Sequence, residues 1–146
     1  MEIRIRKLKE EEGEYLEIGC HKVDENVNEI IRFAKLRQGS LEAFRDEKLY
    51  QIALSDIYYI EAVDERCFIY LEKECYESKK RLYEFEELLS SRNYIRISKS
   101  MVVNMMKITV IKPALNGRFL CRLKNGESVI ISRKYVPDVK ERLKNG

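Results

Sequence analysis

The stretch that decides the fold is residues 108–131, ITVIKPALNGRFLCRLKNGESVII. Asn116-Gly117 and Asn125-Gly126 each separate runs in which apolar residues alternate with other residues. Asn-Gly between such runs is the strongest short-range signal for a β-hairpin, because both residues tolerate a positive φ. Two such turns in succession predict a meander of three antiparallel strands over residues 108–114, 119–123 and 129–131.

The sequence on either side of this meander predicts more strands and short helices. Ser132 is positioned to cap a helix that runs to about Leu143. Upstream, helical spacing of apolar residues appears over residues 82–89, and extended patterns occupy residues 41–45, 49–54, 57–63, 67–71, 75–79, 95–97 and 101–103. Strands and helices do not alternate as in a parallel nucleotide-binding sheet. We therefore expect a mainly β fold with short helices (α+β), spanning residues 40–146.

Residues 1–39 predict a small β-β-α extension in front of this domain. Ile3 and Ile5 alternate with arginines, and an extended pattern resumes near Tyr15. Asp24 then caps a helix whose apolar residues stand at helical spacing: Val27, Ile30, Ile31 and Ala34. The helix needs a partner surface, either on a second copy or on the main domain of the same chain. We consider dimerisation and regulation as roles for the extension.

The charges divide unevenly along the chain. Residues 1–90 contain 15 Lys/Arg and 22 Asp/Glu, a net charge of −7, whereas residues 91–146 contain 13 Lys/Arg and 3 Asp/Glu, a net charge of +10. Such asymmetry favours a polyanionic partner for the basic part. The alternative is that the acidic part neutralises the basic part across the folded surface.

Cysteine usage and hydropathy favour a cytoplasmic protein. Cys20, Cys67, Cys75 and Cys121 form no C-x-x-C pair, so we expect no metal site and interpret them as small apolar residues in a reducing cytosol. A Cys67–Cys75 disulfide is the alternative. The start MEIRIRK is too charged for a signal peptide, and no apolar run approaches the roughly 18 residues of a membrane helix.

The chemistry that catalysis needs is sparse. His21 is the single histidine, and the sequence contains no H-E-x-x-H, G-x-S-x-G or G-x-x-x-x-G-K-[ST] motif. Acidic pairs such as Glu86-Glu87 are typical of a solvated helix face. We therefore expect no enzyme activity, no cofactor and no small-molecule substrate.

Two constellations in the basic part could contact nucleic acid. In the first, Arg96, Ser98, Lys99 and Ser100 form a polar stretch directly before an apolar anchor, and Ser100 could cap a short helix facing a phosphate. The alternative is an ordinary polar strand end. In the second, the cations Arg133 and Lys134 follow the cap of the last helix, against the usual preference for acids there. A phosphate or a guanine edge would relieve that cost, and pairing with Asp138 is the alternative.

A weaker candidate is the turn at residues 64–66. Arg66 at a loop tip could reach a groove, but Asp64 and Glu65 would oppose a phosphate.

These segments resemble, in order and spacing, the signatures of the LytTR DNA-binding domain family. The resemblance covers about residues 40–146 and rests on five segments: Ile57-Tyr58-Tyr59-Ile60-Glu61-Ala62, Tyr94-Ile95-Arg96-Ile97-Ser98-Lys99-Ser100-Met101-Val102-Val103-Asn104, Asn116-Gly117-Arg118-Phe119, Leu123-Lys124-Asn125-Gly126-Glu127 and Ile131-Ser132-Arg133-Lys134-Tyr135. It implies an elongated, mostly antiparallel β domain, without a helix-turn-helix, that inserts loops from one edge into successive major grooves of direct-repeat promoter sites.

The resemblance also implies site residues and partners. DNA-facing residues would be Asp64, Glu65, Arg66 and Cys67 in the first loop, Ser98, Lys99 and Ser100 in the second, and Arg133 and Lys134 at the last helix. The residue pattern adds Arg96 to these candidates. The family often has His at the position where this chain has Ser98. We expect a stand-alone bacterial regulator related to response regulators but without a receiver domain, a homodimer at least on DNA, and control by a membrane-protein inhibitor as a further expectation.

Two other functions would share the basic surface. An RNA-binding module would display aromatic residues for stacking. The basic part has only Tyr94, Phe119 and Tyr135, and the pattern around Phe119 indicates burial, which argues against this function. A protein-interaction domain would use the basic surface to dock an acidic partner and would bind DNA without sequence preference.

Overall fold

The computed structural model describes residues 1–145 and divides into two compact units, residues 1–34 and the chain from Lys35 onward. The division falls within the first helix, α1 (Glu25–Arg37), a few residues before the boundary expected after Gly39. Each unit is described by itself.

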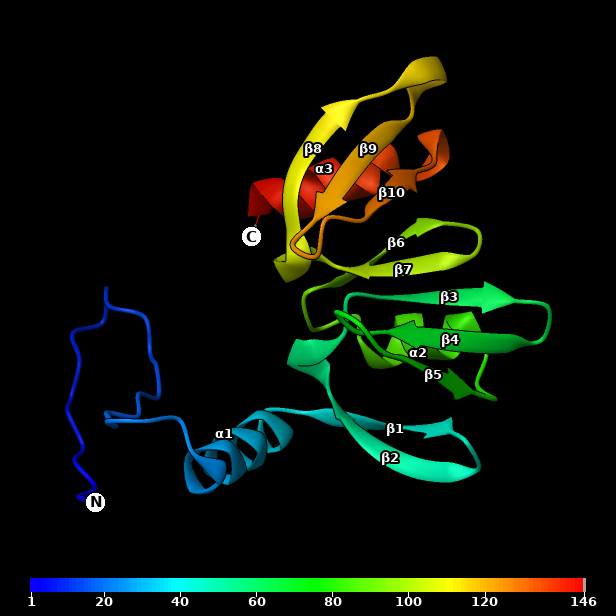
Figure 1. Ribbon diagram of the computed structural model, residues 1–146. Helices are drawn as coiled ribbons and strands as arrows, with labels where there is room; N and C mark the ends of the chain where they lie inside the picture. The colour runs from blue at the N-terminus through cyan, green and yellow to red at the C-terminus, as the bar shows by residue number, and fades with distance from the viewer. Residues whose placement is uncertain (146) are drawn as a thin grey trace. The chain divides into compact units, whose positions relative to one another are not determined.

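The larger unit contains two antiparallel sheets (Figure 1). The first has seven strands in the order β2-β1-β5-β4-β3-β7-β6, and the second has three in the order β10-β9-β8. Their bounds are β1 Ser40–Arg45, β2 Lys48–Ala53, β3 Tyr59–Val63, β4 Arg66–Tyr70, β5 Cys75–Ser78, β6 Tyr94–Ser98, β7 Met101–Asn104, β8 Ile108–Pro113, β9 Phe119–Leu123 and β10 Ser128–Ile131. Two helices accompany them, α2 (Leu82–Leu88) and α3 (Val136–Asn145). The mainly β fold with short helices is confirmed.

The predicted three-stranded meander is present as β8, β9 and β10. The first Asn-Gly turn places Asn116 at φ 60° and Gly117 at φ 77°, so both residues use the left-handed region. In the second turn only Gly126 does so, at φ 90°. The Asn-Gly signal was therefore correct at both positions, although the two turns differ in conformation.

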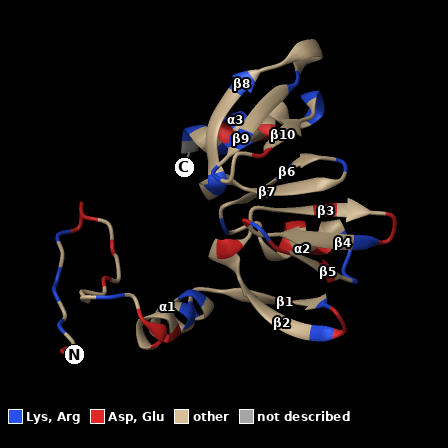
Figure 2. Cartoon of the chain, in the orientation of Figure 1, with Lys and Arg blue, Asp and Glu red and all other residues tan. Residues whose placement is uncertain are grey.

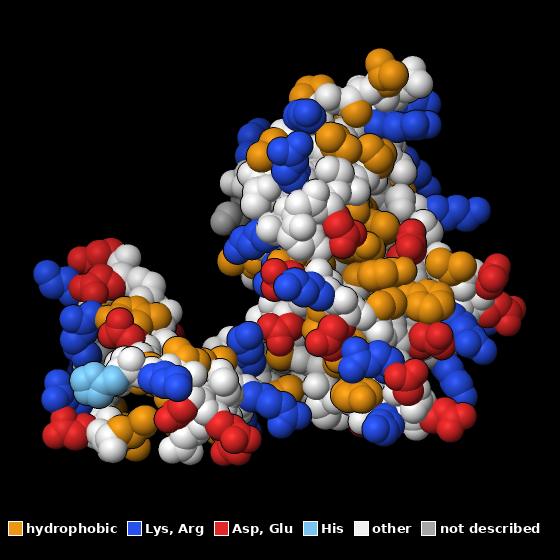
Figure 3. Space-filling view, viewed as in Figure 1, with side chains coloured by type: hydrophobic (Ala, Val, Ile, Leu, Met, Phe, Trp, Pro, Cys, Tyr) orange, Lys and Arg blue, Asp and Glu red, His pale blue; other side chains and the backbone are white. Residues whose placement is uncertain are grey.

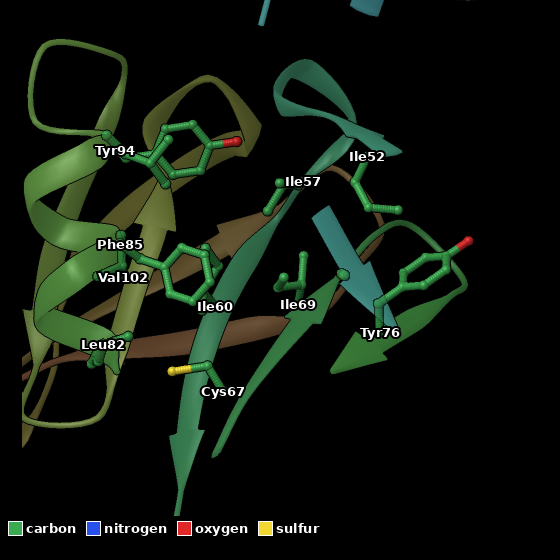
Figure 4. Close-up of a cluster of buried hydrophobic side chains, with 12 residues drawn as sticks. Ile52, Ile57, Ile60, Cys67, Ile69, Tyr76, Leu82, Phe85, Tyr94 and Val102 are labelled. Carbon is green, nitrogen blue, oxygen red and sulfur yellow. The ribbon is translucent and has the colours of Figure 1, made fainter. Parts of the chain in front are cut away.

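Two hydrophobic cores share the central strands of the large sheet. On one face, α2 packs Phe85 and Leu82 against strand residues such as Ile60 and Val102 (Figure 4). The second core lies on the other face of β3, β6 and β7, where it contains Tyr59, Ile97 and Val103. The small sheet adds Cys121, Leu123 and Ile131 to this core, and α3 adds Val139. Because side chains alternate along a strand, the same three strands serve both cores. Packing on both faces therefore holds β3, β6 and β7, and with them the β3–β4 and β6–β7 turns.

The strands predicted in the extension were wrong. Residues 1–24 form no strand in the structure, and the side chains of Ile3 and Ile5 are each 93% exposed. An alternating pattern is compatible with a strand, but a strand exists only where a partner completes its hydrogen-bond ladder. The helix predicted after Asp24 is present as α1, and Asp24 caps it by accepting a hydrogen bond from the Val27 N–H at 2.9 Å.

All four cysteines are free, so the alternative of a Cys67–Cys75 disulfide is wrong. Cys67 and Cys121 are buried, and burial raises the pKa of the Cys121 thiol to about 11. Both are core residues, as the sequence predicted for Cys121. Cys20 is exposed and Cys75 is half-buried.

Candidate nucleic-acid interface

Three of the predicted segments lie along one edge of the larger unit, where successive turns meet (Figure 1). The Ala62 N–H at the end of β3 donates to the Ser100 carbonyl at 2.8 Å, which joins the β3–β4 and β6–β7 turns. The Ser132 N–H donates to the Ile97 carbonyl at 2.8 Å, which joins β6 to the segment before α3. The two backbone hydrogen bonds thus join residues that are 38 and 35 positions apart in the sequence.

The β6–β7 turn presents Lys99 at its tip. The pairing of β6 with β7 shifts register between Arg96 and Ser98, which is a bulge that redirects the turn. The Ser98 hydroxyl accepts a hydrogen bond from the Ser100 N–H at 3.2 Å and so closes the turn. Ser100 lies within the turn and caps no helix, so the predicted helix cap at Ser100 is wrong. The Lys99 side chain is exposed.

Arg96 stabilises this turn through hydrogen bonds from its guanidinium group. Its Nε donates to the Ser98 carbonyl at 2.7 Å, another guanidinium nitrogen donates to the Lys99 carbonyl, and Nη1 pairs with Glu86 of α2 at 3.0 Å. The Arg96 side chain is only 18% exposed. Its donors therefore satisfy the carbonyls that the bulge leaves outside the ladder, and its position favours support of Lys99 over direct contact with a ligand.

The second cationic segment is a 3-10 turn, η4 (Arg133–Tyr135), between β10 and α3. It replaces the first turn of the predicted helix, and Ser132 precedes it without a side-chain capping bond. Arg133 and Lys134 are both exposed. Among residues 1–145, no ion pair joins either of them to Asp138, so the structure does not support that alternative.

The β8–β9 turn lies directly beside η4, a neighbour that the sequence did not predict. A Cβ atom added at Gly117 would stand 2.8 Å from Cδ and 3.0 Å from Cγ of Arg133. The stem of Arg133 therefore rests against the backbone of this turn. The Asn116-Gly117 signal predicted the turn itself, but nothing local in the sequence could identify what packs on it.

The β3–β4 turn is the least cationic of the three segments. Arg66 pairs with Glu77 on the neighbouring strand at 3.1 Å, and Glu65 lies 3.9 Å from Arg81. Cys67 is only 1% exposed, and burial raises the pKa of its thiol. The expectation that Cys67 faces DNA is therefore wrong, because alternation along β4 turns it into the core beneath α2.

Figure 2 shows basic residues at the β6–β7 turn and between β10 and α3, and acidic residues at the β3–β4 turn. In the part of the chain that the structure describes, no cluster of His, Cys, Asp or Glu could hold a metal ion. No helix among the same residues has the length and apolar character needed to cross a membrane.

Known proteins similar to this chain share its architecture. The LytTr DNA-binding domain family matches residues 47–144. The solved LytTr DNA-binding domain of a protein from Bacillus cereus, described as a methyl-accepting/DNA response regulator, superposes with a TM-score of 0.67 at 29% identity. The match covers 71% of this chain and 95% of that domain.

Three relatives show how much of the chain is shared. An uncharacterised HTH-type transcriptional regulator of Staphylococcus aureus is 30% identical over 131 residues, 88% of each chain. The sensory transduction protein LytT of Enterococcus faecalis and the transcriptional regulatory protein YpdB of Escherichia coli K12 are each 30% identical, over 98 and 103 residues. This chain spans only 40% and 42% of their lengths.

The staphylococcal relative is named an HTH-type regulator, but the three helices described here are separated by five strands in each interval and form no helix-turn-helix. The family match covers about two thirds of the chain, and the solved relative has the same mostly antiparallel fold. The relatives named above are regulatory proteins. The expected family is confirmed, and the chain belongs to the LytTR family of DNA-binding domains.

Proposed function

We propose that this protein is a sequence-specific transcriptional regulator that inserts the β6–β7 turn and the η4 segment into successive major grooves of a direct-repeat site. The observation that carries the proposal is the hydrogen bond from Ser132 to Ile97, which holds the two exposed cationic segments side by side. The groove-reading residues are Lys99, Arg133 and Lys134, with Ser98 and Ser100 as hydroxyl donors to the backbone or a base. Arg66 is a peripheral contact, because its guanidinium is paired with Glu77.

In this proposal Arg96 acts through the turn that it supports. Phosphate contacts fix the register of a protein on a duplex, and base-edge contacts supply specificity. The β6–β7 turn is already closed by hydrogen bonds, so the backbone of Lys99 loses no further conformational freedom when its side chain approaches a base edge. The net charge of +10 on residues 91–146 supplies affinity for the phosphate backbone that falls with salt concentration.

An RNA-binding module receives no support from the aromatic residues of the basic part. Tyr94 is buried, and Phe119 and Tyr135 are half-buried and pack on the second core. Stacking on unpaired bases needs an exposed aromatic face. The alternative of a basic surface that docks an acidic protein would give DNA binding without an enriched sequence.

Selection of sequences from random double-stranded DNA on the purified protein, followed by affinity measurements over a range of salt concentrations, tests the proposal. We expect an enriched motif repeated in the same orientation and bound far more tightly than random DNA. Enrichment of an inverted repeat would contradict the direct-repeat arrangement. Binding without any enriched sequence would contradict specific recognition.

The Arg96→Lys variant tests whether Arg96 positions the turn. Lysine keeps the charge but lacks the planar fork that reaches two carbonyls and a carboxylate together. We expect specific DNA affinity to fall roughly tenfold, about 1.4 kcal/mol, in a fluorescence titration at fixed salt. Arg122→Lys, on an exposed position of β9, is the matched control and should bind as the wild type does. Equal affinities of both variants would show that charge alone matters at position 96.

The Gly117→Ala variant tests the packing of the β8–β9 turn against Arg133. Gly117 and Gly126 both have a positive φ, but only Gly117 has a neighbour within 4 Å of an added Cβ. We expect either alanine variant to cost about 1–2 kcal/mol of unfolding free energy, since L-residues disfavour this region. Only Gly117→Ala should also weaken specific DNA binding, because the added methyl displaces Arg133. A similar decrease of affinity in Gly126→Ala would argue against displacement of Arg133 as the cause.

A further inference from the structure

The first unit, residues 1–34, carries more of the exposed large hydrophobic residues than its share of the chain predicts. Figure 3 shows apolar side chains at several places on its surface. Among residues 1–145, eighteen large hydrophobic residues are exposed, and eight of them lie in this unit: Met1, Ile3, Ile5, Tyr15, Leu16, Val23, Ile30 and Phe33. Val27 is the one hydrophobic residue of the unit that is buried. Exposed large apolar side chains that gather in one part of a chain favour an interaction site there.

The same unit is divided into two arms of opposite charge (Figure 2). Residues 2–9 contain four basic residues and one acidic residue, whereas residues 10–17 contain five glutamates and no basic residue. The arms lie side by side, because Arg6 donates a hydrogen bond to the Tyr15 hydroxyl and its guanidinium lies 5.9 Å from the Tyr15 ring centroid. No strand ladder joins them, so their backbone groups remain free to pair with another chain.

The helix of this unit exposes a different stripe from the one that the sequence suggested. Val27 is buried and Ile31 and Ala34 are half-buried, whereas Ile30 and Phe33 are exposed. Ile30 and Phe33 are three positions apart, so they share one face of α1. This pair adds an apolar helix face to the apolar residues of the two arms.

We propose that residues 1–34 form a dimerisation module whose partner is the same module of a second copy. In a two-fold arrangement the basic arm of each copy faces the acidic arm of the other, so one patch complements itself in charge. The alternating residues of the arms then complete inter-chain strand ladders, and Ile3, Ile5 and Leu16 become the apolar centre beneath a charged rim. The arms form no strand within one chain, and in the dimer they pair as strands between the two chains.

Sedimentation of the full chain without DNA tests the dimer directly. The wild type should sediment as a dimer down to low micromolar concentration. The double variant Ile3→Asp/Ile5→Asp should raise the dimer dissociation constant at least about tenfold, because it places charge at the apolar centre. Met106→Asp, at an exposed methionine of the larger unit, is the matched control and should not change it. A wild type that stays monomeric at the highest soluble concentration overturns the proposal, as does a double variant that dimerises normally.

Charge reversal tests whether the arms meet between copies. Arg4→Glu/Arg6→Glu/Lys9→Glu changes the net charge of residues 2–9 from +3 to −3. Glu11→Lys/Glu14→Lys/Glu17→Lys changes the net charge of residues 10–17 from −5 to +1. Each variant alone should be monomeric, and their equimolar mixture should form a one-to-one heterodimer. Failure of the mixture to associate, with both chains folded by circular dichroism, overturns the proposed charge pairing.

Affinities for a single half-site and for a paired site distinguish failure of the dimer proposal from failure of the DNA-binding proposal. The Ile3→Asp/Ile5→Asp variant keeps every residue of the DNA-facing edge, so its affinity for a single half-site should equal that of the wild type. On a paired site, its affinity should fall by roughly a hundredfold or more, because a linked second module contributes a factor of about 10²–10⁴. Equal affinity for paired sites would overturn the role of this module on DNA, whereas loss of half-site binding would implicate the fold of the larger unit.

Discussion

Replacing Lys99, Arg133 and Lys134 together with alanine is expected to weaken specific DNA binding at least about a hundredfold. Each Lys or Arg that reads a base contributes roughly 1–3 kcal/mol of discrimination, and even the lowest sum exceeds a factor of one hundred. Where these residues also neutralise phosphates, the slope of log affinity against log salt should fall by about 0.9 for each phosphate that is no longer neutralised. Titrations at several salt concentrations measure both quantities.

The same triple variant should fold as the wild type does. All three side chains are exposed, and none takes part in an ion pair among residues 1–145, so the unfolding free energy should change by less than about 0.5 kcal/mol for each substitution.

Replacing Lys73, Lys124 and Lys144 with alanine is the matched control for net charge. These lysines are also exposed, and they lie in the β4–β5 turn, the β9–β10 turn and the last turn of α3, outside the β6–β7 turn and the η4 segment. The control should lower nonspecific affinity and leave the preference for the selected site intact. If the control loses that preference as fully as the first variant does, the assignment of Lys99, Arg133 and Lys134 is wrong.

Replacing Phe85 with alanine should cost about 3–5 kcal/mol of unfolding free energy. Phe85 is 1% exposed and is the largest fully buried side chain among the residues that the structure describes. Helix α2 packs it against Ile60, Val102 and their neighbours (Figure 4). Its removal leaves a cavity that the rigid strands beneath can fill only partly. Chemical denaturation followed by circular dichroism measures the change.

Tyr83 provides the control for this prediction on the same helix. Its side chain is 61% exposed, so Tyr83→Ala should change the unfolding free energy by no more than about 0.5 kcal/mol. A small effect of Phe85→Ala, comparable with that of Tyr83→Ala, would mean that α2 is not held against the sheet through Phe85. Because α2 also supplies Glu86 to Arg96, partial loss of DNA affinity in Phe85→Ala is expected as well.

The order of strands and turns could be predicted because each depends on near neighbours in the chain. The turns at Gly117 and Gly126 require a positive φ, and the alternation between them requires one buried face, so local sequence suffices for the meander. The exposed cations Lys99, Arg133 and Lys134 were predicted for the same reason, since exposure follows from position in a turn or helix start.

Contacts between distant segments could not be predicted in this way. Nothing near Arg96 in the sequence indicates that its guanidinium is turned toward the Ser98 and Lys99 carbonyls rather than outward, because that choice depends on the bulge and on Glu86. Cys67 was expected to face DNA, although its register in β4 buries it beneath α2. The arms of residues 1–24 carry a strand pattern and form no strand.

The sequence by itself therefore determined the family, the mainly β fold and the identity of the exposed cations, because these depend on turn chemistry, alternation and local charge. Only the tertiary structure decided which of those residues stand together. Ile97 and Ser132 become neighbours through one backbone hydrogen bond, and Gly117 supports Arg133 through close packing. Such contacts depend on the register of strands far apart in the chain, and a single residue of slip would turn each side chain to the opposite face.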